Sequence, residues 1–305
     1  MGYFNRFINI IQFFDIKYFR KGYFFEILVH KKNYHAQIFK QQISPHSQMN
    51  FFDSFFKKDK DLKMKFSLEI SPQTDLSTVP PVKDVYITML PGGDYKETAQ
   101  QAVELVKKGF NPVPHFPARS MHDEKQLKDY ISRCKDGGVK QVLIIGGGRE
   151  PLGKFDSSFQ ILETGYFEKM TIGIAGHPEG SPDISDSDLE KAMIDKKPYA
   201  DYIVTQWLLD PQPIIDFISK QSVPVHVGIT GPLKISSLIK FANIVGAKNS
   251  INFLKSNFSK ALDLLKPKDP NDLIGKVKSH TDFFHIYTFG GLKETNKWLK
   301  ENGYV

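Results

Sequence analysis

The chain has 305 residues and a formal net charge of +7, and its single cysteine, Cys134, excludes an intramolecular disulfide and a cysteine-based metal cage. Residues 1–63 carry +6 of that charge, so the remainder is close to neutral and lacks the clustered cations that a nucleic-acid groove requires. No apolar run approaches about 18 residues, which excludes a membrane-spanning helix and favours a reducing, cytoplasmic compartment.

Residues 1–63 differ in kind from the rest of the chain. They hold aromatic clusters such as "YFRKGYFFEI" and show no sustained helical or alternating pattern, so we expect an N-terminal extension with little regular structure. Three interpretations compete: an arm that docks on a membrane surface or a partner, a targeting peptide, or translated sequence foreign to the natural protein. Asp15 and Glu26 argue against a targeting peptide, and we favour the third interpretation for residues before Met49.

From residue 64 to 305 the chain alternates short apolar runs with stretches of helical spacing. The strand-like runs are "KFSLEI", "DVYITM", "NPVPHF", "QVLIIG", "MTIGIAG", "DYIVTQ", "VPVHVGI" and "FFHIYTF". Eight strands that alternate with helices predict a single (β/α)8 TIM barrel. The proline-containing connector at 71–83 leaves little room for a helix, so we expect a gap in the outer layer between the first two strands.

Most of these predicted strands end in polar residues. Because the carboxyl ends of barrel strands carry the active site, the chemistry is expected there. The polar strand ends are Glu69, Thr88, His115, Gly148-Arg149-Glu150, Gly176-His177-Pro178-Glu179, Gln206, Thr230, and His285 with Tyr287.

Two of these side chains have a specific chemical use. Glu69 lies within an apolar strand, where burial would raise its pKa toward the range of a general acid; alternatively, it faces solvent or pairs with a lysine such as Lys83. Gln206 offers an amide that can hold a planar, amide-bearing heterocycle, and a capping glutamine is the competing interpretation.

Other common motifs are excluded. "IIGGGREPLG" has Gly146 and Gly148 in the dinucleotide-binding spacing, but Pro151 stands where the third glycine belongs. His280 and His285 straddle a predicted helix-to-strand junction, so we predict no metal site.

The strand ends resemble the methylenetetrahydrofolate reductases, flavin-dependent TIM barrels, from about Phe66 to the C-terminus. "FSLEISP" resembles the family's first-strand motif and places Glu69 at its catalytic glutamate. "IVTQWLLD" and "FFHIYTF" are similar to its folate-side motifs, which implies substrate-binding roles for Gln206 and Tyr287.

The resemblance also implies a flavin site. "VYITM" and "PVPHF" are similar to family segments that hold the cofactor, and "IAGHPEGSP" resembles A-x-Y-P-E-x-H-P with His177 in place of the tyrosine. The family's R-G-D loop is matched here by Gly148-Arg149-Glu150, so Glu150 would tune the flavin. The implied FAD-binding residues are Thr88, His115, Gly148, Arg149, Glu150, Gly176, His177 and Glu179.

The chain differs from the family at three positions that are implied to contact the flavin. Glu150 is one methylene longer than the family's aspartate, Ser181 replaces the second histidine, and Asp195 stands where the family has a lysine, with Lys196 and Lys197 out of register.

The implied activity is reduction of 5,10-methylenetetrahydrofolate to 5-methyltetrahydrofolate with NADH or NADPH through bound FAD, in one-carbon and methionine metabolism. Two alternatives stay open: a flavin-free or oxidising folate enzyme of one-carbon catabolism, and a non-catalytic folate-binding accessory protein. The sequence also leaves open a homo-oligomer.

Overall fold

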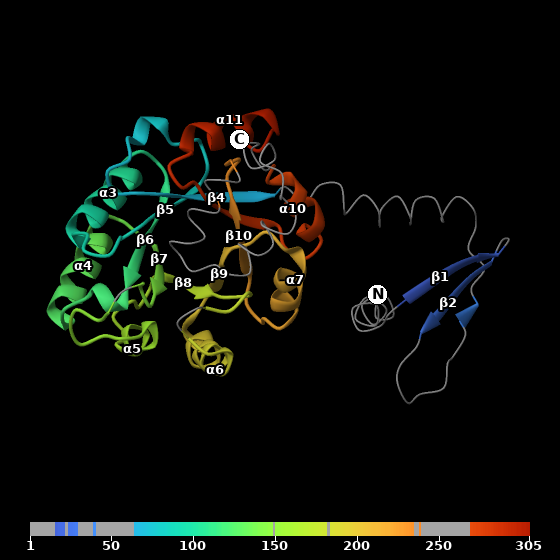
Figure 1. The fold of residues 1–305 in the computed structure, drawn as a ribbon, viewed down its shortest axis with the longest axis horizontal. Coiled ribbons are helices and arrows are strands. Elements are labelled where there is room, and N and C mark those ends of the chain that lie inside the picture. The colour runs from blue at the N-terminus through green and yellow to red at the C-terminus, as the bar shows by residue number, and fades with distance from the viewer. Residues whose placement is uncertain are drawn as a thin grey trace. The chain divides into compact units, whose positions relative to one another are not determined.

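The structure is a computed structural model that describes residues 16–21, 24–29, 39–40, 64–148, 150–181, 184–234, 238 and 269–305. The chain divides into two compact units, Met1–Leu62 and Lys63–Val305, and each is described by itself. Figure 1 shows the second unit as a ring of helices around a barrel of strands.

The first unit contains a three-stranded antiparallel sheet in the order β1-β2-β3. Its strands are β1 (Ile16–Lys21), β2 (Phe24–Val29) and β3 (Phe39–Lys40). The sequence predicted little regular structure here, and of this segment the structure describes these three short strands.

The second unit is a closed barrel of eight parallel strands in the order β10-β11-β4-β5-β6-β7-β8-β9. This confirms the predicted TIM barrel. The strands are β4 (Lys65–Ile70), β5 (Asp84–Ile87), β6 (Asn111–Pro117), β7 (Gln141–Ile145), β8 (Thr171–Gly176), β9 (Tyr202–Trp207), β10 (Val225–Thr230) and β11 (Phe283–Tyr287).

Helices follow most strands, and four of them begin at a side-chain cap. Asp94, Asp123, Ser185 and Asp210 each accept a hydrogen bond from a first-turn amide, which satisfies one of the unpaired N–H groups of a helix start. The helices are α3 (Tyr95–Lys107), α4 (Glu124–Asp136), α5 (Ser158–Glu163), α6 (Asp186–Lys196), α7 (Pro211–Ser219), α10 (Asn271–Val277) and α11 (Leu292–Glu301).

The outer layer thins between the first two barrel strands, as the sequence predicted. The β4–β5 connector contains only one short 3₁₀ turn, η1 (Leu76–Thr78). Two further 3₁₀ turns follow other elements, η2 (Ala118–Ser120) after β6 and η3 (Lys197–Tyr199) after α6. Residues 236–247 are one of the stretches of helical spacing between predicted strands, and of these residues only Leu238 lies within the described part of the chain.

Strand alternation divides the core into two layers. One set of side chains packs outward under the helices, with Leu68 and Ile87 among them, and forms the larger apolar cluster. The inward set forms a smaller cluster in the middle of the barrel, made of Tyr86, Val113, Leu143, Tyr202 and Val204. The barrel centre is therefore filled, and polar inward residues beyond this cluster lie at the C-terminal ends of the strands.

No helix within the described part of the chain is long and apolar enough to cross a membrane.

Candidate functional site

A carboxylate and two imidazoles meet at the C-terminal end of the barrel. Glu69 Oε2 lies 3.5 Å from His115 Nε2 and 3.7 Å from His285 Nε2. The three residues come from β4, β6 and β11, which barrel closure brings together because β11 pairs with β4. His285 is fully buried, whereas the Glu69 side chain keeps 18% of its surface exposed. Glu69 is therefore reachable by a ligand, and the histidines lie behind it.

A serine orients one of these imidazoles. Ser67 Oγ and His285 Nδ1 are 2.9 Å apart, and both residues are buried. Because a carboxylate only accepts hydrogen bonds, a proton on His285 Nε2 is the tautomer that suits the neighbouring Glu69. In that tautomer Ser67 donates to Nδ1, so the pair forms a chain from Ser67 through His285 toward Glu69.

The histidines reverse the pKa shift that the sequence predicted for Glu69. Burial by itself raises the pKa of this carboxyl, but the close approach of His285 and the field of His115 lower it, and the net pKa lies below the ordinary 4.5. The expectation of a raised pKa is wrong for the ligand-free protein. Burial lowers the pKa of His115 more than Glu69 raises it, so His115 is held toward the neutral form.

Two aromatic rings pack against the His285 imidazole of this group from different sides. The Tyr86 ring lies 4.3 Å from the His285 ring, and the Tyr86 hydroxyl bonds that of Tyr202 at 3.2 Å. On the other side, the Tyr287 ring lies edge-on to His285 at 4.8 Å. The Tyr287 hydroxyl donates to the backbone oxygen of Thr205 at 3.0 Å. Tyr287 therefore offers a ligand its ring, since its hydroxyl proton is already engaged.

Gln206 also lies at this end of the barrel, and one of its side-chain atoms lacks a hydrogen-bond partner. Its Oε1 atom is buried and has no hydrogen-bond partner within the described residues. The Nε2 atoms of His115 and His285 share this property. Since buried polar atoms are nearly always paired, the Gln206 oxygen indicates a place where a ligand can supply a donor, whereas the two imidazole nitrogens face the Glu69 carboxylate.

The loop after β8 holds a second polar group. Burial, and secondarily the charge of Lys196, lower the pKa of His177 to about 4. The Lys196 side chain is 8% exposed, and burial lowers its pKa too. A largely buried lysine beside this histidine makes the place favourable for an anion, because burial disfavours the charged form of the lysine unless an opposite charge is near.

The sequence alignment assigned the family's lysine position to Asp195 and treated Lys196 as out of register. In the structure Lys196 is the buried residue of α6, whereas Asp195 is only partly covered. The last turn of α6 therefore buries Lys196, although this lysine stands one residue after the position where the family has its lysine.

The glycine-rich turn after β7 contributes backbone rather than side chains. Gly147 has a φ of +93°, and a Cβ there would lie 3.3 Å from Pro117 Cβ, so this position suits glycine. Gly148 and Glu150 are both exposed, and Arg149 lies outside the described residues. The structure thus gives Glu150 no contact with the Glu69 group.

Packing against the outer layer explains why position 176, a predicted cofactor-binding residue, is glycine. Glu179, another predicted cofactor-binding residue, lies in the turn that follows. A Cβ on Gly176 would lie 2.6 Å from Ile203 and 2.8 Å from Phe217, so this glycine makes room for the outer layer. Glu179 follows in a turn and is partly exposed. Thr88, at the end of β5, donates to the backbone oxygen of Ile70 at 3.3 Å.

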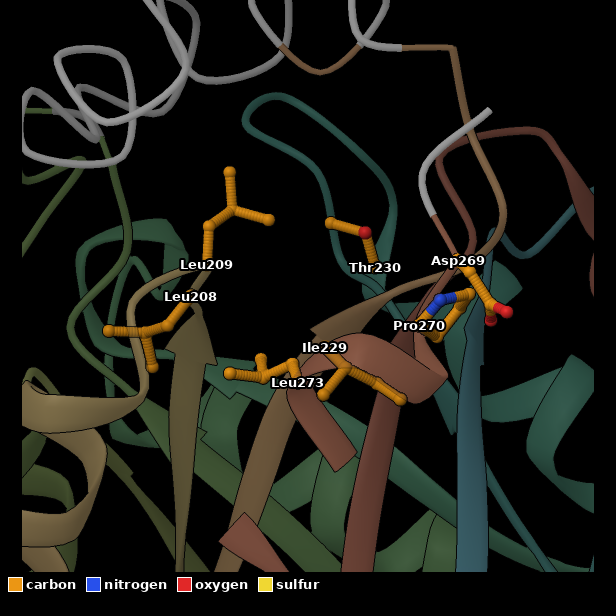
Figure 2. Close-up of a pocket in the computed structure, with 7 residues that line it drawn as sticks. All are labelled: Leu208, Leu209, Ile229, Thr230, Asp269, Pro270 and Leu273. Carbon is orange, nitrogen blue, oxygen red and sulfur yellow. The ribbon is translucent and has the colours of Figure 1, made fainter. Parts of the chain in front are cut away.

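A small apolar pocket opens at the ends of β9 and β10 (Figure 2). Its lining is Leu208, Leu209, Ile229, Thr230, Asp269, Pro270 and Leu273. Leu208, Ile229 and Leu273 belong to the outer cluster under the helices. This pocket is therefore separate from the Glu69 group inside the barrel.

Within the described residues, no group of three or more His, Cys, Asp or Glu side chains could hold a metal ion. The Glu69 group thus has acid–base and hydrogen-bonding chemistry to offer.

A comparison with curated proteins finds methylenetetrahydrofolate reductase 1 of Schizosaccharomyces pombe, 26% identical over 191 residues. The chain resembles a divergent branch of the methylenetetrahydrofolate reductases. The match covers 56% of this chain and 31% of the yeast protein, so the chain spans about a third of the length of that relative. No family model matches the chain.

Among solved structures, this barrel is similar to an uncharacterized protein from Clostridium thermocellum that binds two copies of 5-methyl-5,6,7,8-tetrahydrofolic acid. The TM-score is 0.51 at 14% identity, over 82% of this chain and 99% of the other. At that identity the similarity concerns the fold.

Several residues of the site escaped the sequence analysis or were undervalued by it. His285 was noted only as a polar strand end, and Ser67 and Thr205 were not singled out. The available signal was strand alternation: Ser67 and His285 fall on the same faces of their strands as Glu69 and Tyr287. The burial of Lys196 could have been suspected from its place in the last turn of α6, whose other residues are mostly polar.

Proposed function

We propose that this barrel is a folate-dependent oxidoreductase that reduces 5,10-methylenetetrahydrofolate to 5-methyltetrahydrofolate, with NADH or NADPH as the reductant and FAD as the cofactor. The observation that carries the proposal is the Glu69, His115 and His285 group, together with the unpaired amide oxygen of Gln206 at the same end of the barrel. The sequence resemblance to the yeast reductase and the folate bound by the structural neighbour support it.

Gln206 would bind the pterin. A pterin ring carries an amide-like edge with donors and acceptors in one plane, and a glutamine side chain matches such an edge with its oxygen and nitrogen. The buried Oε1 atom of Gln206 lacks a donor, and leaving it unpaired costs about 1–3 kcal/mol. A ligand N–H at this atom would remove that cost. The Tyr287 ring would cover one face of the ligand.

Glu69 would supply the proton that opens the five-membered ring of methylenetetrahydrofolate. In the ligand-free protein its pKa is lowered, so at neutral pH the group is a carboxylate. A bound ligand would cover the exposed 18% of the side chain and exclude water, which raises a carboxyl pKa. Glu69 would then take up a proton from solvent as the ligand binds and pass it to the folate, while Ser67 holds the His285 imidazole with its Nε2–H toward the carboxyl.

The residues fit a flavin at its anionic part. Lys196 is largely buried close enough to His177 to lower the pKa of that imidazole, and a pyrophosphate would provide a counter-ion for the lysine. Thr88, His115, Gly148, Gly176 and Glu179 would complete the cofactor site, together with Arg149, which lies outside the described residues. A bound flavin supplies hydride transfer, while the protein supplies orientation and charge.

One observation favours a flavin-free folate enzyme as the second candidate. Glu150, the proposed tuning group for the flavin, is exposed. In this alternative the nicotinamide would exchange hydride with the folate directly, in either direction, and Glu69 and Gln206 would keep their roles.

The test begins with the purified full-length chain. We expect a yellow protein with a flavin absorbance spectrum, binding of 5-methyltetrahydrofolate by calorimetry, and reduction of methylenetetrahydrofolate by NADH or NADPH. A colourless protein that catalyses the reaction without added FAD would favour the flavin-free enzyme. Folate binding without turnover under any of these conditions would favour a binding protein, and absence of folate binding would refute the proposal.

A further inference from the structure

The β9–β10 pairing is irregular where Gln206 stands. Val225 pairs with Ile203 and His226 with Val204, but Gly228 pairs with Trp207. The register shift leaves two residues of β9, Thr205 and Gln206, opposite one residue of β10. This is a β-bulge, a feature that turns a side chain away from the direction that regular pairing would give it.

Thr205 closes the bulge with its hydroxyl. Thr205 Oγ1 accepts a hydrogen bond from the backbone N–H of Gly228 at 2.8 Å. The same hydroxyl donates to the backbone oxygen of Gln206 at 2.9 Å. Thr205 is fully buried. One side chain thus replaces the ladder hydrogen bonds that the extra residue interrupts, and it fixes the peptide group from which Gln206 projects.

Two neighbours depend on the same arrangement. A Cβ on Gly228 would lie 2.5 Å from the backbone oxygens of both Thr205 and Gln206, so only glycine lets β10 approach the bulge this closely. The Tyr287 hydroxyl donates to the Thr205 backbone oxygen at 3.0 Å. Beyond the bulge the ladder resumes with the Leu208 N–H bonded to the Gly228 oxygen at 3.2 Å.

We propose that Thr205 is a positioning residue that clamps the β9 bulge and thereby directs the Gln206 amide toward an amide-bearing heterocyclic ligand. This inference rests on the proposed folate function, since the pterin is the heterocycle in question. Thr205 itself makes no contact with the ligand; it acts through Gln206 and through the Tyr287 hydroxyl. The carboxylate of Glu69 lies on another strand and keeps its own partners.

Removal of the hydroxyl should weaken binding without slowing the chemical step. Valine has the shape of threonine but leaves the Gly228 N–H without its acceptor, so the bulge relaxes and the amide of Gln206 loses its fixed direction. At about 0.5–1.5 kcal/mol for each hydrogen bond, the two bonds of Thr205 correspond to a rise of roughly 5- to 140-fold in Kd or KM. The kcat at saturation should stay within about twofold, because Glu69 is untouched.

The experiment compares variants in pairs that differ by the hydroxyl alone. Thr205→Val is set against wild type, and Thr205→Ala against Thr205→Ser, which keeps the comparison valid if the valine variant does not fold. Thr295→Val is the matched control, since Thr295 is a buried threonine on α11 whose hydroxyl has no partner among the described residues. We expect Val and Ala to bind 5-methyltetrahydrofolate weakly, and Ser and the control to bind close to the wild-type level.

A second measurement separates the two proposals. Hydrogen exchange at the Gly228 amide should be slow in wild type and Thr205→Ser and fast in Thr205→Val, whether or not folate binds. If wild type binds no folate, the proposed function fails, while slow exchange at Gly228 still supports the clamp. If Thr205→Val binds folate like wild type, or Thr205→Ser binds as weakly as Thr205→Ala, the positioning role is overturned.

Discussion

The substitution Glu69→Gln tests the centre of the proposed mechanism. It keeps the size and the planar shape of the side chain at the end of β4 and removes both the charge and the exchangeable carboxyl proton. His115 and His285 stay in place, because neither depends on Glu69 for a short hydrogen bond: the two distances are 3.5 and 3.7 Å.

The structure predicts a large loss of rate and a small loss of stability. Loss of a positioned acid costs about 10²- to 10⁴-fold, or about 3–5 kcal/mol of transition-state stabilisation. The folded state loses much less. The lowered pKa of Glu69 means that its charge stabilises the fold above the ordinary pKa of 4.5, but the group is partly exposed and burial holds His115 toward the neutral form. We expect a change in unfolding free energy below about 1 kcal/mol.

The assay measures two reactions of one preparation. Oxidation of NADH or NADPH with an artificial quinone acceptor requires the cofactor and not the folate, so it should continue at the wild-type rate in Glu69→Gln. Reduction of methylenetetrahydrofolate should fall by roughly a hundredfold or more. Glu104→Gln serves as the control, since Glu104 is an exposed carboxylate on α3 that pairs with Lys107.

Two results would refute the reasoning. Methylenetetrahydrofolate reduction at the wild-type rate in Glu69→Gln would show that this carboxyl transfers no proton. An equal loss of both reactions, with folded protein, would assign Glu69 to cofactor binding instead of acid catalysis.

Three further predictions concern other residues. Lys196→Met should raise the melting temperature of the ligand-free protein, because burial lowers the pKa of Lys196 and so disfavours its charged form, and should weaken binding of FAD or ADP; unchanged nucleotide binding would contradict the anion site. Burial, and secondarily His285, lower the pKa of His226 from 6.5 to about 3. Between these two pH values the unfolded chain binds a proton at His226 and the folded chain does not, so the folded state loses stability as the pH falls from about 6.5 to about 3. His226→Phe should flatten that loss in urea unfolding measured across this range, and an equally steep loss would assign it to other groups. Deletion of residues before Met49 should leave the melting temperature and turnover of the barrel unchanged; a large drop in either would mean that the extension contributes to the barrel.

The sequence by itself determined the architecture. Apolar runs of strand length and the helical spacing between them are local signals, and the eight strands and most of the helices that they predicted are present among the described residues. Polar residues at the strand ends then predicted where Glu69, His115 and Gln206 would gather, because all strands of a parallel barrel end on the same face.

Only the tertiary structure decided how the side chains of the site affect one another's pKa values, directions and burial. Glu69 and His285 are far apart in the chain, and only the closure of β11 against β4 lets His285, together with His115, lower a carboxyl pKa that burial would raise. The direction of Gln206 depends on a register shift against β10, and the burial of Lys196 depends on how α6 packs. These properties come from distances between strands and helices, and a pattern along one chain contains no such distances.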